Sequence, residues 1–258
     1  MSPSIDISML EVAAALVLVA IAILASRWRG AGLEGDIAVA VARSFVQLTA
    51  IGYVIDLIFE EDSAALVVAL LVVMVVFGAF TARHRAERVP GALAPLLLAL
   101  ALAAITTLGL VLALGIIEAE PRYVVPVGGM VIGNAMTAAA VALNRLGQDV
   151  SDRSREIEAT LALGATSTQA VSGIVKRSLR SGMITLIDST KTTGLIFFPG
   201  TMVGMLLAGA DPIDAVRLQL ILLYALLGSV AIAALTATTL ARRNFFTDAH
   251  QLREPPVP

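Results

Sequence analysis

Seven long apolar stretches occupy most of this chain and constrain its fold more than any other feature. A helix that crosses a bilayer needs about 20 mostly apolar residues. Stretches of that kind lie at residues 9–26, 37–59, 64–80, 93–117, 123–143, 184–208 and 215–240. The chain is 58% hydrophobic and only 15% charged, unlike a soluble domain. We therefore predict an all-α fold, a polytopic membrane protein with seven transmembrane helices.

The charged residues between these stretches predict the orientation of the chain. Fourteen of the eighteen Lys and Arg residues fall on one side of a seven-span arrangement, whereas the other side carries mainly carboxylates. Cytoplasmic loops of membrane proteins are enriched in Lys and Arg. We therefore expect the N-terminus outside and the C-terminus in the cytoplasm. A six-span or eight-span arrangement would mix the charges.

One sizeable hydrophilic segment, residues 144–181, lies between the fifth and sixth stretches. In this topology the segment is cytoplasmic and belongs to a transmembrane domain of residues 1–243. Residues 244–258 form a cytoplasmic tail, which we expect to be disordered because it is short and rich in proline.

The hydrophilic segment has the pattern of two short helices that meet at a glycine. Residues 156–163 are predicted to be helical, with acidic residues in the first turn, and to stop at Gly164. Thr166 and Gln169 have the spacing of a capping box and begin the second helix. Such a bend offers a surface to a partner, but an amphipathic helix on the lipid surface has a similar composition. Residue types alone leave both interpretations open.

A motif in this segment resembles the EAA loop of ABC-transporter permeases, E-A-A-x3-G-x9-I-x-L-P. Glu158, Ala159, Gly164 and Ile174 have its spacing, and Lys176-Arg177 replaces the final Leu-Pro. The whole chain resembles the FetB family of permeases, associated with iron export, whose plant relatives are linked to aluminium tolerance. The resemblance is carried by residues 43–48, 129–136, 158–165, 188–194, 199–202 and 207–212, and it departs at Met205, where the family often has Gln.

The resemblance implies a subunit of a larger transporter in the bacterial inner (plasma) membrane. It implies two permease chains and two ATPase subunits, which move iron or a related metal ion out of the cytoplasm. The implied ATPase-docking residues are Glu156, Glu158, Ala159, Leu163, Gly164, Ala165 and Thr166. The chain contains no G-x4-G-K-[S/T] loop, so ATP and Mg would bind to the partner ATPase. We expect no cofactor, no covalent catalysis and no nucleic-acid partner for this chain.

Polar residues inside the apolar stretches are candidates for a transport pathway, because ionisable groups in a membrane cost several kcal/mol. The candidates are Arg43, Gln47, Met130, Asn134, Thr137, Asp188, Lys191 and Pro199. Structural alternatives stay open: Arg43 snorkels to the interface, Asp188 and Lys191 form a salt bridge that allows both to be buried, or Asn134 bonds a neighbouring helix. The metal ligands are unknown. Without Cys and with two His, we do not expect a tight resting site for a transition metal.

Pro199-Gly200 interrupts the sixth apolar stretch, so we predict a broken helix there. Broken backbone inside a membrane is tolerated only where protein or a wet cavity covers it. The break therefore marks either a pathway-lining element or a packing kink. Two Gly-x3-Gly pairs, Gly129/Gly133 and Gly200/Gly204, are expected to permit close contacts between helices.

Other functions compete with the ABC permease. One is a secondary ion-coupled carrier or channel that uses Asp188 and Lys191, although no inverted repeat is evident. Another is a transporter of a non-metal substrate. An intramembrane enzyme would need a convergent acid–base or nucleophile set, which the sequence does not contain. A membrane scaffold would need neither the charge pair nor the broken stretch.

Overall fold

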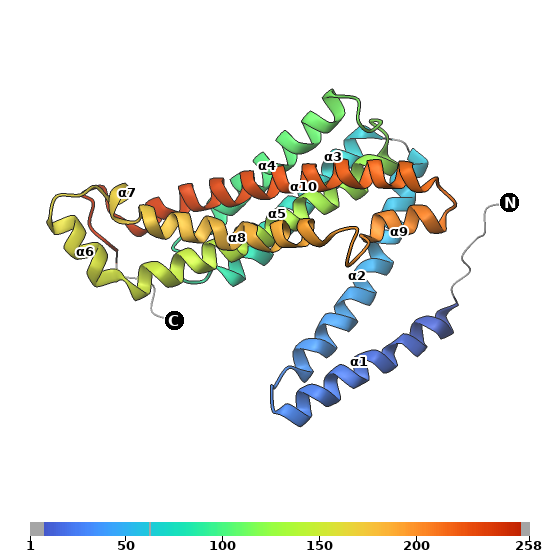
Figure 1. Cartoon of the computed structure of the whole chain (residues 1–258), viewed down its shortest axis with the longest axis horizontal. Helices are drawn as coiled ribbons and strands as arrows, with labels where there is room; N and C mark the ends of the chain where they lie inside the picture. Colours follow the sequence, from blue (N-terminus) through green and yellow to red (C-terminus); the bar gives the residue numbers. More distant parts are fainter. Residues whose placement is uncertain (1–7, 62, 254–258) are drawn as a thin grey trace. The chain divides into compact units, whose positions relative to one another are not determined.

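A computed structural model describes residues 8–61 and 63–253, and these residues are helical apart from turns and two isolated β-bridges. The predicted all-α class is confirmed. The helices (Figure 1) are α1 (Met9–Arg29), α2 (Glu34–Glu61), α3 (Ala64–Arg85), α4 (Leu93–Ala113), α5 (Pro121–Asp152), α6 (Ser154–Ala162), α7 (Ser167–Ala170), α8 (Ser172–Thr192), α9 (Gly200–Leu207), α10 (Pro212–Ala241) and the 3-10 helix η1 (Arg242–Phe245).

Within the described residues, six helices are long and apolar enough to cross a membrane: α1, α2, α3, α4, α5 and α10 together with η1. The predicted stretch 184–208 is not one helix. It covers the second half of α8 and all of α9, with residues 193–199 between them. The predicted break is therefore confirmed, whereas this stretch does not give a seventh helix long enough to cross a membrane among the described residues.

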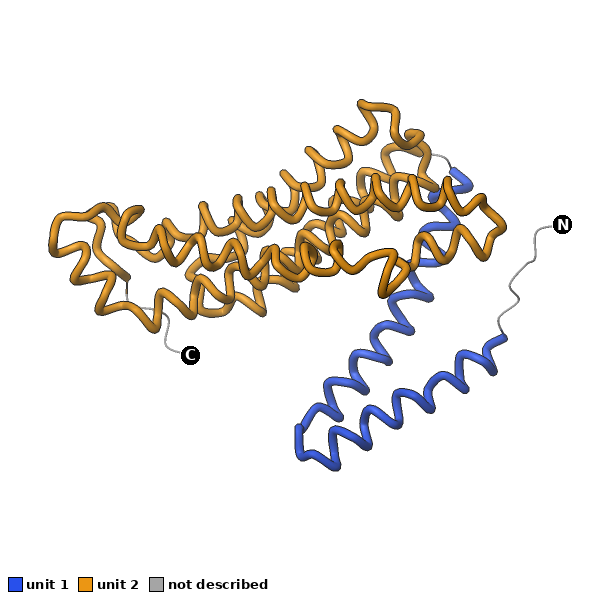
Figure 2. The backbone as a smooth tube through the Cα atoms, viewed as in Figure 1, with its two compact units in different colours: residues 1–62 blue, residues 63–258 orange. Residues whose placement is uncertain are grey.

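The chain divides into two compact units (Figure 2), residues 1–62 and 63–258. In the first unit a short turn, residues 30–33, connects α1 to α2, and the two helices contact each other. The Ser26 hydroxyl accepts from the Leu33 amide at 3.1 Å and donates to the Glu34 carboxylate at 3.0 Å. Gly30 ends α1 with a φ of 64°, a left-handed conformation that favours glycine.

In the second unit α5 is the central helix and packs against α3, α4, α8 and α10. Small side chains on its inner faces, such as Ala135 and Ala139, are fully buried and let the neighbours approach. At Gly182 of α8, an added Cβ would lie only 2.6 Å from the Ala138 carbonyl oxygen of α5. α8 and α5 therefore cross with almost no space between their backbones.

α5 is longer than a single bilayer crossing requires. A helix of 32 residues is about 48 Å long, whereas the hydrocarbon core of a bilayer is about 30 Å thick. The polar residues from Asn144 onwards occupy the excess length. α6 and α7 lie at this end of the unit, and α9 lies at the opposite end (Figure 1).

The expectation of a disordered tail is wrong for residues 244–253. Phe245 is only 1% exposed and belongs to the main core cluster, together with Phe246. The Arg253 amide donates to the Phe245 carbonyl at 2.8 Å, which closes residues 246–252 into a loop. Burial of two aromatic rings explains this order, since each removes a large apolar surface from water. Residues 254–258 lie outside the described residues.

Candidate functional site

The hydrophilic segment contains two short helices joined by a glycine turn. α6 ends at Ala162, and Gly164 follows with a φ of 91°. The Gly164 amide donates to the Leu161 carbonyl at 2.9 Å, and the Ala165 amide donates to the Thr160 carbonyl at 3.3 Å. These two bonds form a Schellman motif, which closes a helix on a left-handed residue. The helix end that the sequence predicts at Gly164 is confirmed.

The second short helix begins at the predicted capping box. Thr166 Oγ1 accepts from the Gln169 amide at 3.3 Å, and Gln169 Oε1 accepts from the Thr166 amide at 2.9 Å. After the four residues of α7, Val171 forms a turn and the chain continues into α8. The segment therefore has a defined backbone path, although most of it is exposed.

The segment is apolar on its inner side and exposed on its outer side. Ile157, Val171 and Ile174 are buried in the main core cluster. The residues predicted to dock an ATPase are exposed, or half-buried in the case of Ala165: Glu156, Glu158, Ala159, Leu163, Gly164, Ala165 and Thr166. Leu163 beside the glycine turn exposes 90% of its surface. The outer side therefore presents acidic and apolar groups together.

Asp149 of α5 connects α5 to α8 at the base of the segment. This role was not predicted from the sequence. The Asp149 side chain is 6% exposed; Oδ1 lies 3.0 Å from Arg145 Nη2, and Oδ2 lies 3.2 Å from Arg177 Nε. Arg145 is one turn away on α5, whereas Arg177 comes from α8. The spacing of Arg145 and Asp149 was a usable local signal for the first pair. No local spacing indicates the second.

The C-terminal loop, residues 246–252, packs against the segment. Phe246 and Leu252 form an antiparallel bridge, and His250 Nδ1 lies 3.0 Å from Ser167 Oγ. A cavity of about 410 Å³ between the loop and α6 is lined by Glu158, Leu161, Ala165, Ala249, His250, Gln251 and Leu252. Glu158 thus borders a cavity whose other wall is the tail.

The candidate pathway residues of α5 lie on one face, as predicted, and two of them bond their own helix. Asn134 Nδ2 donates to the Met130 carbonyl at 2.9 Å, and Thr137 Oγ1 donates to the Gly133 carbonyl at 3.0 Å. Among the described residues, the bond to a neighbouring helix that was the alternative for Asn134 is not present. The helix-to-helix contact is made by Met130, whose Sδ accepts from Thr201 Oγ1 of α9 at 3.7 Å.

A shallow cavity of about 130 Å³ joins this face of α5 to α8 and α10. Its polar lining consists of Asn134, Thr137, Thr185 and Ser189, of which the two α8 hydroxyls were not singled out from the sequence. Neutral oxygen groups are weak ligands for transition metals. Such a lining suits a passing ion better than a resident one.

Asp188 and Lys191 form the predicted pair on one face of α8. Lys191 Nζ lies 2.9 Å from Asp188 Oδ1, and the two side chains are 66% and 58% exposed for Lys191 and Asp188, respectively. The pairing is confirmed, whereas the burial expected from the structural alternative is not present in the single chain. A role for the pair in transport stays a prediction.

The break in the sixth stretch begins earlier than Pro199. The backbone is already extended at Thr193, and Gly194 has a φ of 85°. The Gly194 amide donates to the Phe197 carbonyl at 2.9 Å, so the break is a tight turn. Pro199 is the N-cap of α9. Between them an apolar run is exposed, with Leu195 at 91%.

Arg43 and Gln47 lie one turn apart in α2, and both are exposed. They belong to the first unit, whereas the other six pathway candidates lie in the second, on α5, on α8 and at the start of α9. The candidates on α5, α8 and α9 therefore lie in one unit, whereas Arg43 and Gln47 lie in the other.

Gln219 of α10 is a polar residue that sequence reasoning did not consider. The residue is 7% exposed, and its Oε1 accepts no hydrogen bond from any residue that the structure describes. A buried unpaired amide oxygen costs about 1–3 kcal/mol. The only sequence signal was a Gln within an apolar stretch.

No group of three or more His, Cys, Asp or Glu side chains among residues 8–61 and 63–253 is placed to hold a metal ion.

Comparison with known proteins shows similarity along nearly the whole chain. The model of "Uncharacterised protein family (UPF0014)" matches residues 9–246. STAR2 of Oryza sativa subsp. japonica, a UPF0014 membrane protein, is 38% identical over 248 residues, which cover 96% of this chain and 87% of that protein. ALUMINUM SENSITIVE 3 of Arabidopsis thaliana is 39% identical over 246 residues, covering 95% and 90%.

A bacterial relative is the "Probable iron export permease protein FetB" of Escherichia coli (strain K12). It is 36% identical over 242 residues, which cover 94% of this chain and 93% of that protein. No solved structure matches the chain. The resemblance derived from the sequence is thus confirmed at the level of the family.

Proposed function

The chain belongs to the uncharacterised protein family UPF0014, and from this premise we propose that it is the membrane-spanning subunit of an ABC transporter. It exports iron or a related metal ion from the cytoplasm with energy from a separate ATPase. The similarity to FetB of Escherichia coli, a probable iron export permease, supports a permease for iron. The chain itself carries out transport and no covalent chemistry.

The observation that carries this proposal is the turn from α6 through Gly164 to α7. It is built rigidly, with a Schellman motif on one side and a capping box on the other. Its outer side nevertheless exposes Glu158 and Leu163. A rigid, exposed projection with apolar and acidic groups is suited to the groove of a protein partner. An amphipathic helix on lipid typically carries Lys and Arg on its polar face, whereas α6 carries the carboxylates of Glu156 and Glu158 beside Arg155.

The topology of the proposal has seven crossings, with the N-terminus outside and the C-terminus in the cytoplasm. The crossings are α1 to α5, the broken α8–α9 piece, and α10. The excess length of α5 supports this arrangement, because it places α6 and α7 beyond the hydrocarbon core on the side rich in Lys and Arg. Two copies of the chain form the pore with two ATPases, and the exposed apolar run at residues 195–198 gives each copy a surface for the other.

The proposed path for the ion follows the polar faces of α5 and α8 and ends near α9. Met130, Asn134 and Thr137 contribute one wall, and Thr185 and Ser189 contribute the other. Weak oxygen and thioether contacts allow rapid release, which export requires. Asp188 and Lys191 separate as the cavity changes sides.

Co-purification of an ATPase tests the docking role directly. The chain is co-expressed with a candidate ABC ATPase, and the amount of ATPase retained on the tagged chain is measured. We expect Glu158→Lys to abolish retention, because a carboxylate in the contact becomes a cation. Glu87→Lys makes the same charge change outside the segment and should retain the ATPase. Equal retention by both variants would contradict docking at α6.

The substrate is tested with the reconstituted complex. Iron salts are expected to stimulate ATP hydrolysis in vesicles, and labelled iron should cross only when ATP is present. Stimulation by an organic solute with no response to any metal would replace the metal by a non-metal substrate. Flux driven by an ion gradient without ATP would indicate a secondary carrier.

A further inference from the structure

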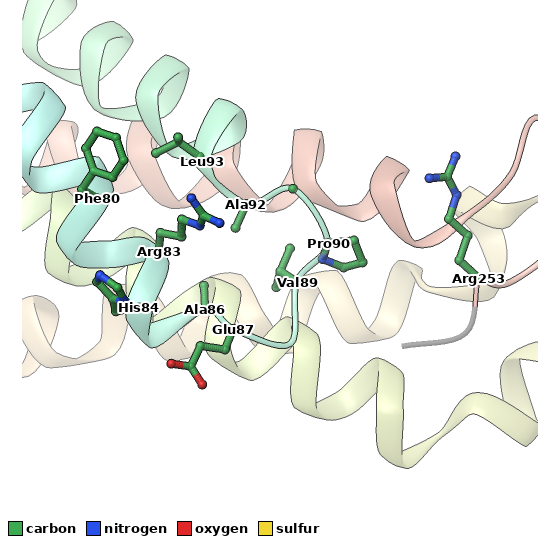
Figure 3. Close-up of a pocket in the computed structure, with 11 residues that line it drawn as sticks. Phe80, Arg83, His84, Ala86, Glu87, Val89, Pro90, Ala92, Leu93 and Arg253 are labelled. Atoms are coloured by element: carbon green, nitrogen blue, oxygen red, sulfur yellow. The ribbon is translucent and has the colours of Figure 1, made fainter. Parts of the chain in front are cut away.

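A cavity in the second unit lies where α3 passes into α4, and it shares no lining residue with the cavities at α6 and between α5 and α8. It has a volume of about 850 Å³ (Figure 3). Apolar lining comes from Phe80 and Leu93, and charged lining comes from Arg83, Glu87 and Arg253. His84 and the loop residues 89–92 complete the wall.

The cavity lies at the edge of the hydrocarbon core. α3 is apolar as far as Phe80 and becomes basic from Arg83 onwards, one turn later. α4 starts directly with an apolar residue, Leu93. Figure 3 shows Phe80 on the same side of the cavity as Leu93, with the Arg83 side chain extending toward the start of α4. An apolar edge thus lies next to a cation, which is the arrangement that complements a phospholipid.

The charges of the lining favour an anion. Arg83 and Arg253 oppose the single carboxylate of Glu87, and His84 adds two ring nitrogens. Neither arginine forms an ion pair with a carboxylate of residues 8–61 or 63–253. The C-terminal end of α3 and the N-terminal end of α4 both border the cavity, and their opposite partial charges offset each other. The charged side chains therefore determine the sign of the electrostatic potential in the cavity.

Arg253 is held at this cavity by the fold of the tail. Its amide donates to the Phe245 carbonyl at 2.8 Å, and Phe245 is buried. Asn244 Nδ2 donates to the Pro90 carbonyl at 2.8 Å, which ties the tail to the loop between α3 and α4. The backbone of Arg253 is therefore held beside the cavity by its bond to a buried residue.

We propose that this cavity binds the phosphate headgroup of an anionic phospholipid, with Arg83 and Arg253 as the cations and Phe80 and Leu93 against the first part of an acyl chain. Guanidinium groups bind phosphate through charge-assisted hydrogen bonds. Basic pockets between membrane helices bind lipid headgroups by the same chemistry. The apolar edge favours a lipid over a soluble phosphate. The proposal requires only that the chain spans a membrane and does not depend on the ATPase or the ion.

Native mass spectrometry of the full chain in mild detergent, titrated with phosphatidylglycerol, tests the site. We expect one tight lipid, and a loss of affinity of about tenfold or more in Arg83→Gln and in Arg253→Gln. Arg85→Gln is the matched control: Arg85 is exposed two residues from Arg83 and does not line the cavity. Glu87→Gln should strengthen binding several-fold, a gain that misfolding cannot produce.

Three results would overturn the proposal. An equal loss in Arg85→Gln would indicate general surface charge. Equal binding of phosphatidylcholine would show that the anionic charge is not read. If glycerol phosphate displaces the lipid and binds with an affinity similar to that of the lipid, the cavity is a site for a soluble phosphate. If Arg83→Gln is unstable, unchanged affinity in both Glu87→Gln and Arg253→Gln is the overturning result.

Discussion

Arg177 of α8 binds the buried carboxylate of Asp149 of α5, with 3.2 Å between Nε and Oδ2. The two residues are 28 positions apart, and the whole of α6 and α7 lies between them in the chain. The pair therefore closes the base of the hydrophilic segment. Arg145 completes the cluster from the preceding turn of α5.

Removing the Asp149 carboxylate should destabilise the second unit. Loss of one partner of a buried ion pair costs about 3–5 kcal/mol. The two arginines here are more than 40% exposed, which reduces the expected loss for Asp149→Asn to about 1–3 kcal/mol. Thermal unfolding in detergent measures it. Asp214→Asn, in the exposed pair with Arg217, should change stability by no more than about 0.5 kcal/mol. Equal effects would contradict the structural role of Asp149.

Substitution of Gly164 should loosen the segment through backbone strain alone. No atom lies within 4 Å of an added Cβ, but the φ of 91° is unfavourable for other residues. We expect Gly164→Ala to cost about 1–2 kcal/mol and to speed proteolysis within the segment. Gly173→Ala is the control, because Gly173 is helical and exposed and alanine should stabilise it by up to about 1 kcal/mol. Slower cleavage of the Gly164 variant would contradict the assigned turn.

The Asp188–Lys191 pair distinguishes a transport role from a structural one. Both side chains are exposed, so Lys191→Ala should change stability by less than about 1 kcal/mol. We nevertheless expect ATP-dependent metal flux into inside-out vesicles to fall, since the proposed path loses its cation. Restoration of flux by the neutral pair Asp188→Asn with Lys191→Gln would show that only a local bond is required. Unchanged flux in Lys191→Ala at normal protein levels would remove the residue from the pathway.

Gln219 should be replaceable by leucine with a gain in stability. Its unpaired buried oxygen costs about 1–3 kcal/mol, which leucine does not incur. A gain of about 1 kcal/mol corresponds to roughly 2–4 °C in Tm for a chain of this size. The matched control is Gln148→Leu, at a half-buried position, which should give no gain. A fall in Tm for Gln219→Leu would show that the amide is paired.

The helices, the glycine turn and the local side-chain pairs could be predicted from the sequence, because each depends only on residues close together in the chain. The lengths of the apolar stretches predicted the helices, because a bilayer requires about 20 residues for each crossing. The predictions of a helix end at Gly164, of the Thr166–Gln169 capping box and of the Asp188–Lys191 pair are confirmed. The two pairs could be predicted because helix geometry brings residues three positions apart close together. These relationships do not require knowledge of any other helix.

Contacts between residues that are distant in the sequence could be identified only from the packing of the helices. The predicted Gly-x3-Gly pairs make few close contacts within the described chain: Gly133, Gly200 and Gly204 have no atom within 4 Å of an added Cβ. Gly182 takes that role, because the register of α8 on α5 places it against Ala138. The same register brings Arg177 to Asp149, and the buried ring of Phe245 brings Arg253 to α3. Such contacts depend on how packed helices are rotated and shifted against each other, and no local spacing encodes that.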